Sequence, residues 1–261
     1  MKKIFLLVAF ALVTSVASAW HTNSNAAVVV LATKHLTPEA KSVVVKHLGT
    51  AYEDDCGYIY VLERKTKSPY SKDVHYLHLD KNFQPMDVDC NDALVALEKE
   101  LALLAEREKR SDDEVKRALR FVINLMCDIH NLSNIRIENI PHSHKDFSFR
   151  RQKSEYATND YITYNWSNYW LRHSNSYAVF HADLMAEDME LSNGKRYDEF
   201  TKGSLRDWVA DNGAKAAGYL EKMSPNSVIT LREYLLHDFA NYDMMTRAGF
   251  RLAVLLNNYI K

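Results

Sequence analysis

The chain has 261 residues, a near-neutral formal charge of −1 and 47% hydrophobic residues. These values allow one large domain with a substantial apolar core, and they exclude a global basic field that would draw the protein to nucleic acid. With only seven glycines and five prolines, the chain is predicted to be mostly helical.

The first residues have the pattern of a secretory signal peptide. Lys2 and Lys3 precede an apolar run over residues 4–16, and an Ala-Ser-Ala cleavage site follows at residues 17–19. The apolar run is too short to be a membrane span. We therefore predict a secreted or periplasmic protein without a membrane span, from which the signal peptide, residues 1–19, is removed.

Cleavage after Ala19 would leave Trp20 as the new N-terminus and lower the net charge to about −3, because two lysines are removed. The remaining residues, 20–261, are expected to form a single domain and a monomer. We find no repeat, low-complexity tract or Gly/Pro-rich linker that would divide this stretch.

Three cysteines are an odd number for an exported protein, so at most one internal disulfide can form. The cysteines are Cys56, Cys90 and Cys127. The position of Cys127 inside a predicted helix favours Cys56 with Cys90 as the pair.

Apolar residues spaced three and four positions apart predict several amphipathic helices. Thr37 as N-cap and Gly49 beyond the end bound a helix that begins at Pro38. An amphipathic helix is predicted over residues 91–110, and Thr230 would cap the last helix. The apolar side chains of that last helix expected to close the bundle are Leu235, Phe239, Met245, Leu252 and Leu255.

The central predicted helix covers about residues 112–130. Ser111 and Glu114 form a capping box at its start. Asn124 and Asp128 lie four positions apart, on one face beside the apolar stripe. An isolated buried carboxylate costs several kcal/mol, so Asp128 requires a partner, either a metal ion or only Asn124.

An alternating stretch from Tyr161 to Tyr164 predicts a short β-hairpin. Aromatic side chains in and after it could stack bases or pack a sugar-like ligand, or belong to the core. They are Tyr161, Tyr164, Trp166, Tyr169 and Trp170. A local basic cluster could contact a few phosphates or simply be solvated, and it consists of Arg150, Arg151 and Lys153.

The run over residues 121–134, FVINLMCDIHNLSN, resembles the signature helix of the zinc-dependent single-strand-specific nucleases, the S-one/P-one nuclease family. That family is similar to bacterial zinc phospholipase C. Its run reads approximately F-L-V-H-F-x-G-D-I-H-Q-P-L-H, and the first His, the Asp and the last His bind zinc. Asp128 matches the Asp, whereas Asn124 and Asn134 replace the two histidines. The resemblance implies a mainly α fold, a phospholipase C/nuclease-type helical bundle with a short β-hairpin.

Further matches extend this resemblance over residues 20–258. In the family an N-terminal Trp binds zinc through its amine and carbonyl groups, which corresponds to Trp20 after cleavage. The family's His five residues later falls on Asn25, and its H-Y-x-D motif matches His75. Its W-A-D acid falls on Glu63, which is either an altered ligand or a solvated surface charge.

The family's L-H-S-V-W-D-S-G-L-I stretch aligns with SYAVFHADLM. This alignment places Tyr177 on a His ligand and His181 on an Asp ligand. The Tyr177 phenol, with a reference pKa of about 10, would have to ionise before binding zinc. His181 could bind a metal but brings no negative charge. Near the end, residues 207–223 resemble the family's W-A-x-E-S helix and residues 247–253 its A-G-x-R-L-A ending.

The resemblance implies hydrolysis of phosphodiester bonds in single-stranded DNA or RNA by a water bound to three zinc ions. The zinc ligands that it implies here are Trp20, Glu63, His75, Asp128 and His181, with Asp128 also catalytic. The family ligand positions that carry other residues are Asn25, Asn124, Asn134 and Tyr177.

Two hypotheses follow from this ligand set. In the first, the chain is an exported member of the family whose phosphodiesterase activity is degraded or lost, with a residual binding role. In the second, it is an active nuclease with a reduced or rearranged zinc site. Single-stranded nucleic acid or nucleotides are the partners that the resemblance implies. Because amides bind zinc poorly compared with imidazole, the ligand count favours the first hypothesis.

Overall fold

The computed structural model describes residues 20, 22–53, 70, 72–86, 92–139, 148–156, 159–177 and 179–260. This part of the chain is mainly helical, as predicted, with a few short strands. The α-helices are α1 (Thr22–Lys34), α2 (Pro38–Leu48), α5 (Ala93–Ala105), α6 (Asp112–His130), α7 (Trp166–Ser176), α8 (Ala182–Asn193), α9 (Tyr197–Thr201), α10 (Leu205–Lys222) and α11 (Leu231–Tyr259). The 3₁₀ helices are η1 (Lys72–His75), η2 (Arg107–Lys109), η3 (Leu132–Asn134) and η4 (Gly194–Arg196).

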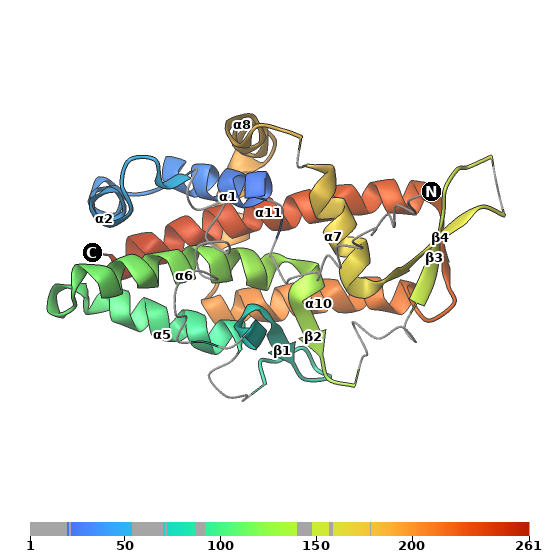
Figure 1. Ribbon diagram of the computed structural model, residues 1–261, viewed down its shortest axis with the longest axis horizontal. Helices are drawn as coiled ribbons and strands as arrows, with labels where there is room; N and C mark the ends of the chain where they lie inside the picture. Colours follow the sequence, from blue (N-terminus) through green and yellow to red (C-terminus); the bar gives the residue numbers. More distant parts are fainter. Residues whose placement is uncertain are drawn as a thin grey trace, which may run out of the picture.

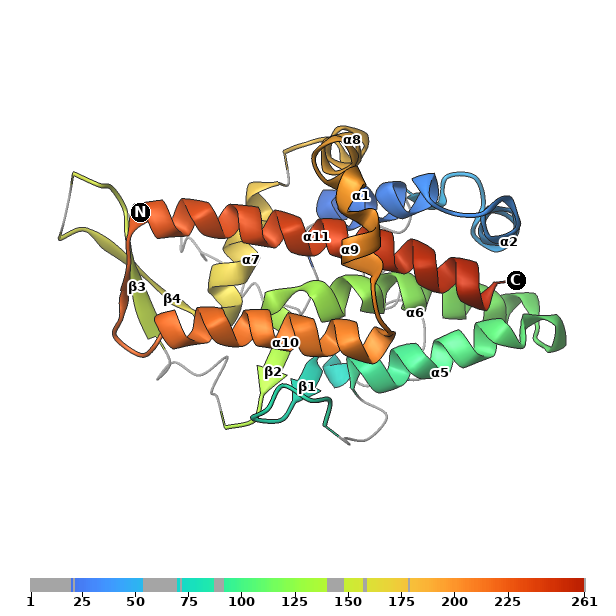
Figure 2. The same cartoon turned by 180° about the vertical axis from the view of Figure 1, so that it is seen from behind.

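The long helices lie along the long axis of the molecule (Figure 1). In the middle, α6 packs against α11, while α5 and α10 flank α6 and α1 lies against α11. Helix α8 crosses α1 and is seen nearly end on. From behind, α9 crosses α11 on its way from α8 to α10 (Figure 2). This layout places α6 in the centre of the bundle.

Capping residues start the helices where the sequence predicts. The Thr37 side chain accepts a hydrogen bond from the backbone N–H of Ala40 at the start of α2. Ser111 and Glu114 form both bonds of a capping box before α6, and Thr230 does the same with a glutamate before α11. The predicted bounds of α6 are confirmed.

A close approach of α1 and α11 depends on one glycine. A Cβ atom built on Gly249 would lie 2.8 Å from Cδ2 of Leu31, nearer than side-chain carbons pack. Both helices are largely apolar and buried at this contact. A larger residue than glycine at position 249 would therefore push α1 away from α11.

Two small sheets accompany the helices. β1 (Leu77–Leu79) pairs in parallel with β2 (Ile135–Ile137), with Leu77 opposite Ile135. Since β1 follows η1 and β2 follows η3, this pairing brings the ends of the two 3₁₀ helices together. The second sheet has the order β4, β3, β5, formed by β3 (Ser148–Gln152), β4 (Tyr161–Asn165) and β5 (Val228–Ile229). The stretch from Tyr161 to Tyr164, predicted to form a hairpin, lies in β4 and supplies one strand of an antiparallel pair. The other strand is β3, which was not predicted.

Two roles were open for the aromatic residues of this region, and the core role is confirmed for Trp166, Tyr169 and Trp170. These three residues belong to α7 and are fully buried, so they cannot stack bases.

The prediction for two side chains of α11 is wrong. Leu235 and Phe239 are 51% and 73% exposed and do not close the bundle. Each is two positions from the buried His237 and therefore lies on the opposite side of the helix.

Several sequence predictions lie outside the described residues, namely the signal peptide over residues 1–19, Glu63, and the cysteines Cys56 and Cys90. The third cysteine, Cys127, is buried in α6. Among the described helices, none is both long and apolar enough to cross a membrane.

Candidate functional site

Asp128 lies at the centre of a buried polar cluster. Its carboxylate is 0% exposed. Oδ2 lies 2.8 Å from Nδ1 of His75 and accepts a longer bond, 3.3 Å, from Nδ2 of Asn124. Oδ1 accepts a hydrogen bond of 2.8 Å from Nδ2 of Asn134. We refer to His75, Asn124, Asp128 and Asn134 as the Asp128 cluster.

Local structure explains how these four residues meet. Asn124 and Asp128 are one helical turn apart on α6, as the sequence predicts. After α6 ends, the Asn131 side chain accepts from the backbone N–H of Ser133, and this turn folds η3 back toward the helix. The Ser133 hydroxyl donates to Oδ1 of Asn134, so the amide nitrogen of Asn134 points at Asp128. His75 comes from η1, which the β1–β2 pairing holds close by.

The protonation of Asp128 is set by opposing effects. Burial raises the pKa of the Asp128 carboxyl group, while His75 and the amide of Asn134 lower it. One proton lies between Nδ1 of His75 and Oδ2 of Asp128 whichever of the two groups carries it. When Nδ1 holds that proton it cannot accept another, so the 3.4 Å approach of Asn124 to His75 is then a packing contact.

The other predicted ligand positions on α1 and before it are also buried. The Trp20 indole N–H donates to Oδ1 of Asn241 on α11 at 3.0 Å. In the 261-residue chain the Trp20 nitrogen is a peptide amide, so the ligand that the resemblance implies can exist only after cleavage. Asn25 is buried in α1, and its Oδ1 atom accepts no hydrogen bond from the described residues.

Tyr177 and His181 do not join the Asp128 cluster. The Tyr177 hydroxyl donates to the backbone oxygen of Asp238 at 3.0 Å. Burial, and then the charge of Asp238, raises the pKa of the Tyr177 phenol above its ordinary value, so it stays un-ionised. The His181 side chain is 72% exposed at the start of α8, with Nδ1 3.3 Å from a carboxylate oxygen of Asp183.

The described residues do not fit the zinc ions that the resemblance implies. Zinc sites in proteins use imidazole, thiolate and carboxylate ligands, usually four for a structural ion and three for a catalytic one. The Asp128 cluster has one imidazole and one carboxylate, and its other two members are amides. Within the described ranges, no group of three or more His, Cys, Asp or Glu side chains could hold a metal ion.

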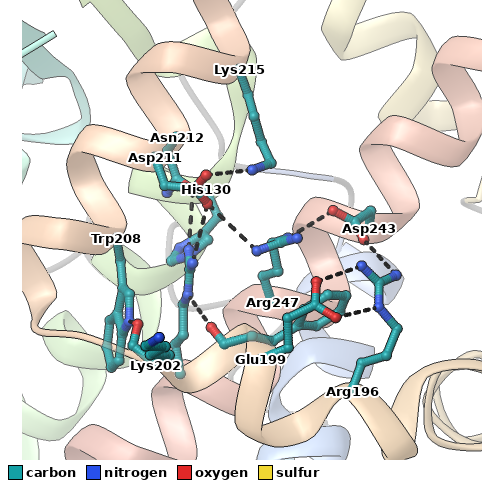
Figure 3. Close-up of polar contacts among 12 residues, drawn as sticks. His130, Arg196, Glu199, Lys202, Trp208, Asp211, Asn212, Lys215, Asp243 and Arg247 are labelled. Atoms are coloured by element: carbon teal, nitrogen blue, oxygen red, sulfur yellow. Dashed lines mark hydrogen bonds and ion pairs between the residues drawn. The ribbon is translucent and has the colours of Figure 1, made fainter.

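A second buried polar centre joins α6 to α10 and α11 and was not predicted. Arg251 is 3% exposed and donates from Nη1 to Nε2 of His130 at 3.0 Å and to Oδ1 of Asn212 at 3.2 Å. It also donates from Nε to the backbone oxygen of Phe200 and from Nη2 to Asp211. Figure 3 shows His130, Asn212 and Asp211 at this centre. Arg251 therefore connects four separate segments.

This arrangement defines the protonation of His130. Because the Arg251 guanidinium can only donate, Nε2 of His130 accepts, and Nδ1 donates to the backbone oxygen of Met126 at 2.9 Å. Burial, followed by the charge of Arg251, holds the pKa of His130 well below its ordinary value. His130 is therefore a neutral structural residue, although it matches a histidine of the family's signature run.

A third cluster lies between α7 and the first half of α11. Nδ1 of His173 lies 2.5 Å from Oδ1 of Asp238, and the Tyr169 hydroxyl lies 2.6 Å from Nδ1 of His237. Burial raises the pKa of Tyr169, so its hydroxyl donates and His237 accepts. The rings of Tyr169, His173 and Tyr234 pack edge to face or tilted. The three- and four-residue spacings place these side chains on one face of each helix, but only long-range packing brings the two faces together, which no sequence spacing reveals.

The basic cluster predicted before the hairpin is mostly engaged. Lys153 pairs with Asp160 at 2.7 Å. The guanidinium of Arg151 lies over the Tyr234 ring at 4.4 Å and that of Arg150 over the Tyr161 ring at 4.9 Å. Each of these three cations thus has an intramolecular partner.

Comparison of the sequence with protein-family models and with curated proteins gave no significant match.

Proposed function

We propose that this protein is an exported, non-catalytic relative of the zinc-dependent single-strand nucleases, built on their type of helical bundle and retaining a binding role. In this proposal, the Asp128 cluster replaces a metal centre with a set of side-chain hydrogen bonds. The cluster joins α6, η1 and η3 and so contributes to the stability of the domain. Processing after Ala19 and export belong to the same proposal.

One observation is the main support for this proposal. Both oxygens of the buried Asp128 carboxylate accept hydrogen bonds from side chains, and two of the three donors are amides at positions where the family has zinc-binding histidines. A buried carboxylate needs such partners, because its desolvation costs several kcal/mol. With these donors in place, the carboxylate is satisfied without a cation.

The experiment uses protein produced with its signal peptide and recovered in its processed form. We expect metal analysis after dialysis to find far less than one equivalent of zinc. We also expect no hydrolysis of single-stranded DNA, single-stranded RNA or a chromogenic phosphodiester when zinc is added. Thermal unfolding should be the same with and without a chelator, because no metal contributes to the free energy of unfolding.

Bound zinc with chelator-sensitive hydrolysis would overturn the proposal in favour of an active nuclease. A matched Asp128→Asn variant separates true activity from a contaminating nuclease. Hydrolysis by this protein should be lost in that variant, whereas contaminating activity should be unchanged. Loss of hydrolysis in a variant that still folds would therefore count against a non-catalytic role.

A further inference from the structure

A cavity of about 390 Å³ lies between α8 and α11, within the size range of pockets for small molecules. Helix α8 supplies one wall, and α11 supplies the opposite wall. Tyr177, which directly follows α7, completes the lining. The lining residues are Tyr177, Asp188, Ser192, Asn193, Phe239, Tyr242 and Asp243. The cavity shares no lining residue with the Asp128 cluster.

Aromatic rings form a large part of the lining. The Tyr177 and Tyr242 rings lie with centroids 5.7 Å apart at an angle of 35°. Both hydroxyls donate to protein oxygens, Tyr177 to the backbone oxygen of Asp238 and Tyr242 to the carboxylate of Asp188, so the rings are held in place. Phe239, which is mostly exposed, adds a third ring. The face of an aromatic ring carries partial negative charge and attracts cations.

The two carboxylates of the cavity differ in their partners. Asp243 is compensated, because Oδ2 accepts from Nε of Arg247 at 2.7 Å and Oδ1 lies 3.8 Å from Arg196 (Figure 3). Asp188 accepts a hydrogen bond from the Tyr242 hydroxyl and forms no ion pair within the described part of the chain. Among the described residues, therefore, no cation pairs with the negative charge of Asp188.

Neighbouring charges do not offset Asp188. Helix α8 contains four acidic residues and no lysine or arginine. On the side of α8 that faces α1, Glu187 pairs with Lys34 and Glu190 with His35, so these basic groups are occupied elsewhere. The unpaired carboxylate of Asp188 thus disfavours phosphates and carboxylates and favours cations beside it.

We propose that this cavity binds a small organic ammonium ion. The cation would lie against the rings of Tyr177, Tyr242 and Phe239, with the Asp188 carboxylate as its counter-ion. A quaternary ammonium fits this lining well, because it needs no hydrogen-bond acceptor and gains from contact with ring faces. Ser192 and Asn193 add polar groups to the lining for a hydroxyl or similar substituent.

The experiment compares two probes of nearly the same shape, choline and its neutral carbon isostere 3,3-dimethylbutanol, by calorimetric titration of the full protein at constant ionic strength. We expect choline to bind saturably and the neutral isostere to bind at least about tenfold more weakly, corresponding to about 1.4 kcal/mol or more. Equal binding of the two probes, or no binding of choline up to about 10 mM, would overturn the proposal.

Two variants on the same helix test the role of Asp188. Asp188→Asn should weaken choline binding at least about tenfold and leave the isostere unaffected. Asp183→Asn, at an exposed position beside His181, is the matched control and should bind choline like the wild type. Equal effects of the two substitutions would show general charge attraction and refute the specific site. Thermal unfolding of each variant confirms that it is folded.

Discussion

Arg251 donates a hydrogen bond of 3.0 Å to Nε2 of His130, and the same guanidinium reaches α10 and the end of α9. The fork of the guanidinium allows all of these bonds at once, whereas a lysine ammonium on a flexible stem could not reproduce them. We expect Arg251→Lys to lower the free energy of unfolding by about 2–4 kcal/mol, because buried acceptors lose their donors. Urea denaturation measures this change.

The matched control for Arg251→Lys is Arg206→Lys on α10. Arg206 forms a bidentate pair with Glu98 at 2.8 Å, but at an exposed position. Surface ion pairs contribute about 0–1 kcal/mol, so the control should change stability little. Similar losses in the two variants would contradict the structural role of Arg251.

The bond between Asn134 and Asp128 can be isolated by a double-mutant cycle. We expect Asn134→Leu alone to destabilise the protein by about 2–3 kcal/mol, because Oδ1 of the buried carboxylate then lacks a donor. In an Asp128→Leu background, the same substitution should cost less. The coupling free energy from urea denaturation is expected to be about 1–3 kcal/mol. A coupling near zero would mean that the two side chains do not stabilise each other.

The geometry of the Asp128 cluster also predicts that two substitutions would create a zinc site. Replacing the two amides by imidazoles, in the double variant Asn124→His/Asn134→His, would place three histidines and one carboxylate around one point. Such a set suits a tetrahedral zinc ion. We expect the double variant to bind about one equivalent of zinc and to unfold at a higher temperature when zinc is present.

Adding Asp128→Asn to that double variant should weaken zinc binding strongly, since the only anionic ligand is lost. Circular dichroism checks that each variant is folded. A folded double variant that takes up no zinc would show that the amides of Asn124 and Asn134 do not mark former ligand directions.

Stability should fall in acid because of His237. Burial, and then the charge of His173, lowers the pKa of His237 to about 4 in the folded protein, although Glu233 and Asp238 act in the opposite direction. The unfolded chain, with an ordinary histidine pKa near 6.5, therefore binds this proton first. The stabilisation is complete above pH 6.5 and is lost as the pH falls from about 6.5 to about 4. The neutral, buried His130 acts in the same direction.

The measurement is the pH dependence of the unfolding free energy. One histidine can contribute a slope of at most about 1.4 kcal/mol per pH unit in this range. In a His237→Gln variant the slope should decrease by up to that amount, whereas His181→Gln, at an exposed position, should leave it unchanged. Identical slopes in the wild type and the His237 variant would refute the role of His237.

Local signals in the sequence predicted much of the fold. The capping box of Ser111 and Glu114 located the start of α6, Thr230 as N-cap located the start of α11, and the four-residue spacing predicted the Asn124–Asp128 contact. These features depend on residues close in the chain. The exposure of Leu235 and Phe239 was missed, because apolar spacing identifies a helix face but not whether another helix covers it.

Long-range contacts explain what the sequence could not predict. Asn134 reaches Asp128 only because η3 turns back after α6, and His75 arrives through the β1–β2 pairing. The bond from Arg251 to His130 spans 121 positions. The resemblance to the nuclease family pointed to Asp128 and its neighbours, but it gave no indication of the Arg251 centre or of the cavity beside Asp188.

Asp128 and His130 are two positions apart on α6, so their side chains point in directions about 200° apart around the helix axis. One is held by His75 and Asn134, and the other by Arg251 from the far end of the chain. Turning α6 about its axis, or sliding it by one residue, would break both sets of bonds together. Together, the two sets of bonds therefore fix both the rotation and the axial position of α6 between its neighbours.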